Sequence, residues 1–416
     1  MKITYLHQYF NTPSMPGSTR SYEMAKRLVA MGHEVSIVTS WREADGRKQS
    51  FETIEVGIKV HWLPVAYSNR MGFKERILAF LKFALLSSQR AASLKSDIIF
   101  ATSTPLTIAI PAIYAAYKRR VPMVFEVRDL WPEMPIAMGA LTNPLLVRAA
   151  QSLETWAYQN ASAVVALSPG MKMGVMRAGY PSSRVAVIPN GCDNAEFAGE
   201  KDAASKFRTS RPWLGDNPLL IYAGTFGRVN GVGYVVDLAK HLLSIGSNIR
   251  LLLVGDGEEY ERILLKARES GVLDQNLFFE SGVSKRDVSV LFAAATMASN
   301  LVIDLPEARA NSANKFFDSL AAGTPIFLNH GGWMHDLVLE HRCGIAAWGS
   351  PLVQVAMELD CRLNDSEWLK RAGNSSRKLA ECCFDRDMLA SQLERVLVAT
   401  VNGKPKMAES IAPGVY

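Results

Sequence analysis

Cysteine is scarce in this chain, and its arrangement excludes two kinds of site. The 416 residues include five cysteines, an odd set in which no pair has C-x-x-C spacing. A disulfide framework and a structural zinc site both need paired, suitably spaced cysteines. We therefore expect neither, and we expect a cytoplasmic protein, because free thiols persist in a reducing compartment.

Long apolar runs and basic clusters are missing as well. No apolar run has the length of about 20 residues that a membrane-spanning helix needs, and the first residues, MKITYLHQYF, do not resemble a signal peptide. Basic residues are not interleaved with aromatic ones, so nucleic acid is not an expected partner. The net charge of +6 suits a nucleotide diphosphate or an anionic membrane surface.

Several catalytic signatures are also absent. The first βα turn, QYFNTPSMPGSTR, has the single glycine Gly17 instead of G-x-G-x-x-G, and VGDGEEYERI has only G-x-G, so NAD binding is not expected. Neither His7 nor His330 has a nucleophile or an acid at triad spacing, which argues against hydrolase chemistry. No D-x-D motif stands at the end of a predicted strand, which agrees with metal-free catalysis. We also expect no cofactor.

What the chain does have is a regular alternation of short Val- and Ile-rich strands with helical segments, which is typical of parallel sheets covered on both faces. We predict an α/β protein with two Rossmann-like, doubly wound parallel-sheet domains facing each other across a cleft. Ligands bind such sheets at the C-terminal ends of the strands. The predicted parts are a first domain over residues 1–195, a linker over 196–217, a second domain over 218–384 and a helix over 385–416 that returns to the first domain.

The most informative segment is NKFFDSLAAGTPIFLNHGG, residues 314–332. It places Asp318 on a helix before Gly323, then a short strand and the pair Gly331-Gly332. One carboxylate can accept hydrogen bonds from both hydroxyls of a ribose, and glycines let the backbone approach a sugar or a phosphate. The alternative is an ordinary helix–strand corner. The pattern resembles the nucleotide-sugar site of retaining GT-B glycosyltransferases of glycosyltransferase family 4, where the acid binds the donor ribose.

A glycine-rich turn is the second element of the resemblance. The segment AGTFGR ends the first strand of the second domain, and relatives carry basic residues there that hold the donor diphosphate. This chain has Thr225 and Asn230 at the two usual basic positions, with Gly227 and Arg228 between them. It is similar to a bacterial branch that reads G-x-x-G-[KR], so the resemblance implies that Arg228 binds the diphosphate.

The resemblance implies further donor contacts. Asn314 and Lys315 begin the helix that carries Asp318, where backbone amides and a positive charge can bind phosphate; a solvated surface lysine is the alternative for Lys315. The backbone at Val283 is expected to contact the base, and Gly17 lies in the first βα turn. For VGDGEEYERI, a role beside the nucleotide and a plain structural role both stand.

One departure concerns the donor sugar. Relatives usually carry a second acid eight residues before the ribose acid, and this chain has Ala310 there. Glu307, Asn311 and Asn314 are the alternatives for that contact. A sugar with a different pattern of hydroxyls would also account for the change.

The segment FEVRDLWPE, residues 125–133, ends a predicted strand of the first domain. Relatives carry a polar pair such as His-Asp there, at the donor sugar, and Arg128 and Asp129 take those positions. A salt bridge between these two side chains, with no catalytic role, is the alternative interpretation.

Residues 72–95 form a predicted helix with apolar Ile77, Phe80, Leu81, Ala84 and Leu85 on one broad face and Lys74, Lys82 and Arg90 opposite. It is either a helix packed on the first sheet or an interfacial helix that binds anionic lipid, with Lys118–Arg120 beside it. The second interpretation makes the protein peripheral on the inner face of the cytoplasmic membrane.

Within family 4, the chain resembles the WbuB-like L-fucosamine transferases of bacterial O-antigen assembly. The resemblance implies metal-independent, retaining transfer of N-acetyl-L-fucosamine or a related amino sugar from a UDP-sugar to a sugar on polyprenyl diphosphate, in O-antigen or capsule assembly. A UDP-sugar 2-epimerase of the same fold and a non-catalytic nucleotide-sugar binder are the alternatives.

Overall fold

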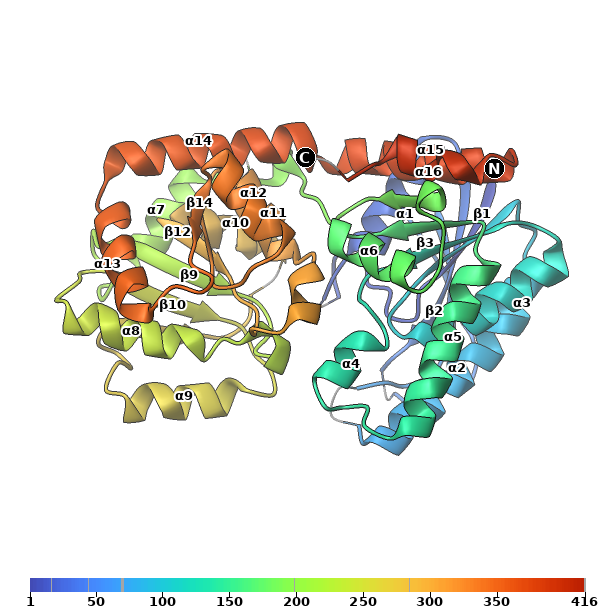
Figure 1. Ribbon diagram of the computed structural model, residues 1–416, viewed down its shortest axis with the longest axis horizontal. Coiled ribbons are helices and arrows are strands. Elements are labelled where there is room, and N and C mark those ends of the chain that lie inside the picture. Colours follow the sequence, from blue (N-terminus) through green and yellow to red (C-terminus); the bar gives the residue numbers. More distant parts are fainter. Residues whose placement is uncertain (16, 44, 69–70, 198, 284, 415–416) are drawn as a thin grey trace. The chain divides into compact units, whose positions relative to one another are not determined.

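The structure is a computed structural model, and it describes residues 1–15, 17–43, 45–68, 71–197, 199–283 and 285–414. The chain forms two compact units (Figure 1). The first unit consists of Met1–Pro189 and Asp387–Val415, and the second unit consists of Asn190–Arg386.

An eight-stranded sheet forms the centre of the first unit, in the order β3-β4-β2-β1-β5-β6-β7-β8. All neighbours are parallel except β3, which pairs antiparallel with β4 at one edge. The sequence pattern did not predict β3, because its alternate residues are exposed and it lacks the Val/Ile run of the other strands. The strands are β1 (Lys2–Leu6), β2 (Glu34–Trp41), β3 (Phe51–Glu55), β4 (Ile58–Pro64), β5 (Ile98–Thr102), β6 (Met123–Val127), β7 (Ala163–Ala166) and β8 (Val185–Val187).

Helices cover both faces of this sheet. Side chains of α1 (Arg20–Ala30), α15 (Arg386–Val401) and α16 (Ala408–Ile411) share one hydrophobic core with alternate strand residues. On the other face, α2 (Phe73–Ser93) and α3 (Ala109–Arg119) contact each other and the strands, with α5 (Pro144–Asn160) beside α3 (Figure 1). The unit also contains α4 (Glu133–Ala137), α6 (Pro169–Arg177), η1 (Leu106–Ile108), η2 (Ser182–Arg184) and η6 (Pro405–Met407).

The second unit has a six-stranded parallel sheet in the order β11-β10-β9-β12-β13-β14. The prediction of two Rossmann-like parallel-sheet domains is confirmed. The strands are β9 (Leu219–Ala223), β10 (Arg250–Val254), β11 (Leu277–Glu280), β12 (Met297–Asn300), β13 (Ile326–Leu328) and β14 (Gly344–Ala346).

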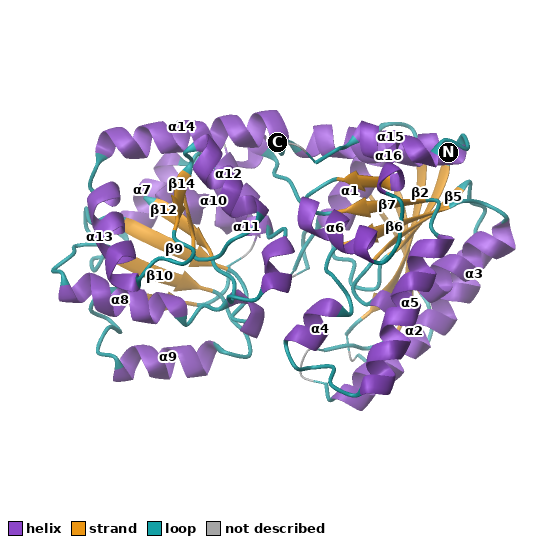
Figure 2. Ribbon diagram, in the orientation of Figure 1, coloured by secondary structure: helices purple, strands orange, loops and turns teal. Residues whose placement is uncertain are grey.

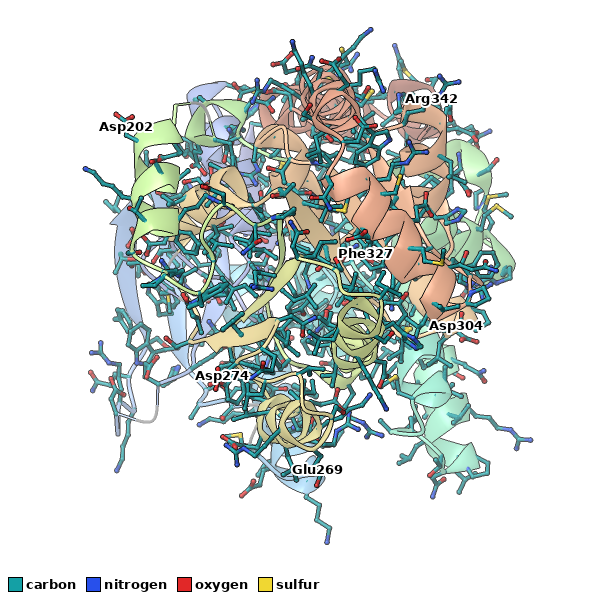
Figure 3. The ribbon with its side chains drawn as sticks, turned by 90° about the vertical axis from the view of Figure 1, so that its left-hand side faces the viewer. Asp202, Glu269, Asp274, Asp304, Phe327 and Arg342 are labelled. Atoms are coloured by element: carbon teal, nitrogen blue, oxygen red, sulfur yellow. The ribbon has the colours of Figure 1, made fainter. Side chains whose placement is uncertain are left out.

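Two cores sandwich this sheet, and Figure 2 shows its strands between helical layers. One contains α8 (Tyr234–Ser244), α9 (Tyr260–Glu269) and α13 (Leu352–Leu363), and the other contains α7 (Lys201–Thr209), α10 (Lys285–Ala294), α11 (Asn314–Ala321), α12 (Trp333–His341) and α14 (Ser366–Cys383). Figure 3 shows Phe327 inside the unit and the charged residues that it labels at the periphery. Short 3-10 turns are η3 (Asn194–Phe197), η4 (Arg228–Asn230) and η5 (Pro306–Ala310).

Two segments differ from, or refine, the expected domain limits. Residues 196–217, expected as a linker, contain α7 and belong to the second unit, because Phe197, Ala204 and Leu214 are buried in it. The helix expected over 385–416 is α15 followed by α16, and both pack in the core of the first unit. None of the helices in the described part of the chain combines the length and the hydropathy that crossing a bilayer requires.

Candidate functional site

The best-defined group of predicted residues in the second unit gathers around the ammonium of Lys315. Its Nζ donates hydrogen bonds to Tyr222 Oη at 3.0 Å and to Asn230 Oδ1 at 3.4 Å. The same nitrogen lies 4.1 Å from the centroid of the Tyr222 ring. Because the Tyr222 hydroxyl donates to the carbonyl of Thr225 at 2.7 Å, its oxygen is oriented to accept from Lys315.

The surroundings of this ammonium are neutral. Among the described residues, the hydrogen-bond partners of Lys315 are a phenol and an amide, and no ion pair joins it to a carboxylate. Burial lowers the pKa of Lys315 to about 7. A half-buried amine without a counter-charge is a candidate site for an anionic ligand.

The glycine-rich turn after β9 lies directly against this amine. Gly224 has a φ of +155°, and a Cβ there would lie 3.0 Å from Lys315 Nζ. The Asn230 side chain packs against Gly227 in the same turn, since a Cβ on Gly227 would lie 3.3 Å from Asn230 Nδ2. Thr225 and Arg228 are exposed on the same turn. The structure therefore brings Asn230 and Lys315 together, and it leaves the Arg228 guanidinium in solvent.

The backbone of the VGDG segment forms hydrogen bonds with the backbone of this turn. The amide of Gly224 donates to the Val254 carbonyl at 3.0 Å, and that of Phe226 donates to the Asp256 carbonyl at 2.9 Å. A Cβ on Gly255 would lie 1.9 Å from the carbonyl oxygen of Gly224. These contacts favour the structural interpretation of VGDG, because its glycines are needed for close approach of two backbones.

Replacing Gly255 by alanine should destabilise the second unit by about 3 kcal/mol or more, because a backbone clash adds to the strain of a φ of +148°. Chemical denaturation measures this. Gly246 is the matched control, since it has a φ of +71° and a Cβ there would meet no atom within 4 Å. Gly246→Ala should lower the free energy of unfolding only by the cost of placing alanine in a left-handed backbone conformation, about 1–2 kcal/mol. Equal losses in the two variants would contradict the supporting role of Gly255.

The helix α11 places the other predicted donor residues. Asn314 and Lys315 form its first turn, where free amides and the helix dipole favour an anion. Asp318 lies one turn further on, half-buried, and close enough to Cys192 that, after burial itself, its charge raises the pKa of that thiol. Asn314, Lys315 and Asp318 thus share one short helix.

The remaining predicted residues make no described hydrogen bond to Lys315. Val283 is exposed after β11, and Glu307 is half-buried in η5. Ala310 is buried. Asn311 is held by its own loop, because its Nδ2 donates to the Ala308 carbonyl at 2.9 Å. The structure brings none of these side chains into hydrogen-bond contact with Lys315 among the described interactions.

A buried pair, His330 and Asn300, was not predicted, and it lies next to the Gly331-Gly332 turn, here called the second glycine turn. His330 Nδ1 must donate to the Gly331 carbonyl at 2.9 Å, so Nε2 is the acceptor for Asn300 Nδ2 at 3.4 Å. Burial lowers the pKa of His330 to about 4, which keeps the ring neutral. Asn300 ends β12 and fixes the ring that holds the Gly331 carbonyl. No local motif marks this contact.

In the first unit, Arg128 is held by hydrogen bonds to neutral groups. Its guanidinium donates to His7 Nε2 at 3.3 Å and to Ser18 Oγ at 3.1 Å. Burial, followed by the charge of Arg128, lowers the pKa of His7, which keeps this ring an acceptor. Asp129 is exposed and accepts from Thr104 Oγ1 at 3.2 Å. No salt bridge joins Arg128 to Asp129 among the described interactions, and the interpretation of the pair stays open.

Gly17 belongs to the same part of the first unit. Its φ is +116°, and a Cβ would lie 2.7 Å from Asn11 Nδ2. Ser18, the next residue, bonds to Arg128. The first βα turn and the end of β6 therefore meet, as expected for residues at the C-terminal edge of one sheet.

The face of α2 differs from the prediction. Phe83 and Ala84 are buried, whereas Ile77, Leu81 and Leu85 are exposed. The helix thus has two apolar faces, an inner one that is buried and an outer one that is exposed, where a single face was predicted. Lys74 and Lys82 are also exposed and lie beside the outer one rather than opposite to it. Arg90 instead contacts Glu52 and His61.

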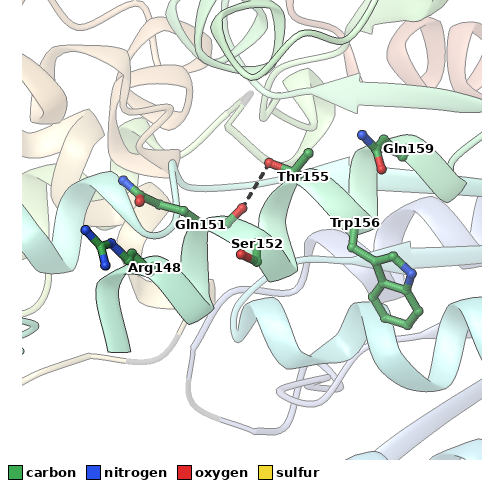
Figure 4. Close-up of a pocket in the computed structure, with 6 residues that line it drawn as sticks. All are labelled: Arg148, Gln151, Ser152, Thr155, Trp156 and Gln159. Atoms are coloured by element: carbon green, nitrogen blue, oxygen red, sulfur yellow. Dashed lines mark hydrogen bonds between the residues drawn. The ribbon is translucent and has the colours of Figure 1, made fainter. Parts of the chain in front are cut away.

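A shallow groove of about 470 Å³ runs along α5 (Figure 4). None of the predicted site residues lines it. Its lining consists of Arg148, Gln151, Ser152, Thr155, Trp156 and Gln159.

Comparison with protein families agrees with this two-part arrangement. Residues 17–191 match the glycosyl transferase 4-like domain, and residues 204–378 match the glycosyl transferases group 1. The two matches follow one another and together include most of the chain. The chain belongs to the group 1 glycosyl transferases. The Lys315 cluster lies within the second match.

Part of this group 1 glycosyl transferase is similar in sequence to a bacterial protein. "Putative glycosyltransferase EpsF" of Bacillus subtilis (strain 168) is 29% identical over 131 residues, which are 31% of this chain and 34% of that protein. The aligned part thus spans about a third of that relative.

Solved structures match over nearly the whole chain. Sucrose-phosphate synthase from Thermosynechococcus elongatus has a TM-score of 0.78 at 16% identity, covering 97% of this chain and 99% of that one. HepE of Anabaena, in complex with UDP-glucose, has a TM-score of 0.71 at 17% identity, covering 96% and 100%. WaaG, a glycosyltransferase involved in lipopolysaccharide biosynthesis, has a TM-score of 0.70 at 17% identity, covering 95% and 99%. These likenesses show that the fold is GT-B.

Proposed function

We propose that the protein transfers a sugar from a UDP-sugar, with retention of anomeric configuration and without a metal ion. The observation that carries the proposal is the neutral cage around Lys315 at the start of α11, inside the segment that matches the group 1 domain. An anion with two phosphates suits that position. The UDP-glucose complex of HepE, a protein of the same fold, supports UDP as the nucleotide.

The proposed reaction needs little chemistry from the protein. The bond between the anomeric carbon and the β-phosphate oxygen breaks, and an acceptor hydroxyl forms the new bond on the same face. The departing phosphate oxygen takes the hydroxyl proton, and UDP leaves. Lys315 and the amides at the start of α11 stabilise the charge that develops on the diphosphate. Arg128 and Asp129 are proposed to orient the sugar.

The proposed sugar is N-acetyl-L-fucosamine or a related amino sugar, and the proposed acceptor is a sugar on polyprenyl diphosphate in O-antigen or capsule assembly. These assignments rest on the resemblance described above. WaaG, which has the same fold, acts in lipopolysaccharide biosynthesis. Release of UDP that depends on an acceptor would separate transfer from epimerisation and from simple binding.

Asp318 provides the direct test of the nucleotide site. Asp318→Ala should weaken UDP binding by about 1.5–3 kcal/mol, because a charge-assisted hydrogen bond to the ribose is lost. Isothermal titration calorimetry measures the change. Asp202→Ala is the control, since Asp202 is exposed on α7 (Figure 3). Unchanged UDP affinity in folded Asp318→Ala would remove Asp318 from the site.

We further propose that the outer face of α2 binds an anionic membrane, where a lipid-linked acceptor would lie. Ile77, Leu78, Leu81 and Leu85 are exposed along one stripe of the helix, and an exposed apolar stripe is costly in water. Lys82, exposed on the same helix, supplies the positive charge for anionic lipid.

Wild-type protein should sediment with vesicles containing anionic lipid at low salt and dissociate at high salt, because each basic residue contributes only about 1 kcal/mol. Lys74→Glu/Lys82→Glu should abolish sedimentation. Lys404→Glu/Lys406→Glu makes the same charge change at exposed positions of the first unit and should still sediment. Equal binding of the Lys74/Lys82 variant would leave α2 as an ordinary packed helix.

A further inference from the structure

An exposed tryptophan stands at the edge of the second sheet, two residues beyond β14. Trp348 is 42% exposed, and its indole Nε1 donates to Asp304 Oδ1 at 3.3 Å. A large aromatic side chain in solvent forfeits the stabilisation that burial would give it. The hydrogen bond to Asp304 orients the ring despite its exposure.

Two further groups complete a cluster around this ring. The guanidinium of Arg309 lies 4.5 Å from the ring centroid, and its Nη2 donates to Asp304 Oδ1 at 3.1 Å. Both donors therefore use the same carboxylate oxygen. No described residue bonds to Oδ2, and the Asp304 side chain is 70% exposed at the surface seen in Figure 3.

The cluster is joined to the turn that precedes α12. A Cβ on Gly331 would lie 2.8 Å from the Trp348 ring, so the indole packs directly on the glycine backbone. A Cβ on Gly332 would lie 2.4 Å from the Arg309 carbonyl oxygen, and its φ is +105°. The second glycine turn thus contacts three side chains or backbones: His330 donates to the Gly331 carbonyl, Trp348 packs on Gly331, and the Arg309 backbone packs on Gly332.

We propose that Trp348, Asp304 and Arg309 form a saccharide subsite that contacts one pyranose ring beside the nucleotide. An aromatic surface suits the C–H groups of a sugar, an exposed carboxylate oxygen accepts from hydroxyls, and a guanidinium donates to ring substituents. The inference rests on the proposed function, but it assigns to these residues the sugar and not the nucleotide. The pyranose belongs either to the donor or to the acceptor.

Two measurements with the full chain distinguish these sources. The first is the affinity for UDP-N-acetylglucosamine and for UDP by calorimetry. The second is saturation-transfer NMR with methyl N-acetylglucosaminide in the presence of UDP. Trp348→Ala should weaken the binding of one of the two saccharides, UDP-N-acetylglucosamine or the methyl glycoside. Its affinity should fall by about five- to tenfold, as expected for a lost aromatic contact. UDP affinity should be unchanged.

The outcomes separate the possibilities. A loss confined to UDP-N-acetylglucosamine assigns the ring to the donor sugar, and a loss confined to the methyl glycoside assigns it to the acceptor. Trp156→Ala removes a tryptophan that is 40% exposed on α5 and should change neither. Trp348→Phe keeps an aromatic surface and should retain most of the saccharide binding.

If neither saccharide binds less well to Trp348→Ala, the subsite is overturned. An equal loss of UDP and UDP-N-acetylglucosamine binding would also overturn it, because Trp348 would then only shape the glycine turn. Failure of the wild-type protein to bind UDP would instead refute the proposed function.

Discussion

Lys315→Met should lower turnover with a UDP-sugar by about 10²- to 10³-fold, the loss expected when one preorganised group that stabilises a leaving anion is removed. The ammonium is partly buried among a phenol, an amide and a glycine turn, so solvent cannot replace it. Methionine replaces the apolar part of the lysine side chain as far as Cε and removes the ammonium. Acceptor-dependent release of UDP measures the effect, and affinity for uridine should change little.

Arg228 provides a graded comparison. Its side chain is exposed, so water and salt screen its charge, and Arg228→Met should cost less than Lys315→Met. Lys378→Met, at an exposed position on α14, should leave turnover unchanged. Activity that survives in the Lys315→Met/Arg228→Met double variant would refute the leaving-group assignment.

The fold was largely predictable because its signal is local. Each parallel strand buried on both faces is a short apolar run, and the turns between them are rich in glycine and polar residues. The exceptions have physical causes. In β3 the exposed side chains alternate with half-buried ones, so no apolar run marks it. The segment 196–217 contains charges, glycine and proline, yet Phe197 and Leu214 pack in a core of the second unit and attach the segment to it.

The site was predictable only where a motif spans it. Asn230 and Lys315 were both proposed from motifs, and the structure places them in contact. Tyr222 was missed, because its partner Lys315 lies 93 residues away and the tyrosine itself belongs to an apolar strand. Trp348 was missed for the same reason, since it meets Asp304 from 44 residues away.

A buried ion pair in the first unit shows the same limit. Arg20 donates to Glu126 at 2.9 Å and also to the carbonyls of Ile188 and Pro189. The two charges are 106 residues apart in sequence. On their own helix and strand each of them has the pattern of a surface residue, and only the sheet topology brings them together. Each charge indicates an oppositely charged partner but not the position of that partner in the sequence.

The neutral cage of Lys315 predicts a second large effect, on the pH dependence of donor binding. Burial holds the pKa of Lys315 at about 7 before the donor binds. A bound diphosphate places negative charge beside it and must raise that pKa, so the complex takes up a proton above pH 7. Affinity for a UDP-sugar should be constant well below pH 7 and should fall by up to about tenfold for each pH unit above it, until the pKa of the complex is reached.

Calorimetry with UDP-glucose from pH 6 to about pH 9 tests this slope, because neither phosphate of a UDP-sugar titrates in that range. Two neighbours do not interfere: His330, with a pKa of about 4, stays neutral, and burial raises the pKa of Tyr222 above the range. Titrations in buffers of different ionisation enthalpy count the proton taken up. Lys315→Met should bind more weakly and lose the slope. A slope that persists in this variant would assign the proton to another group, and an affinity that is flat in the wild type would show that Lys315 is already charged before the donor binds.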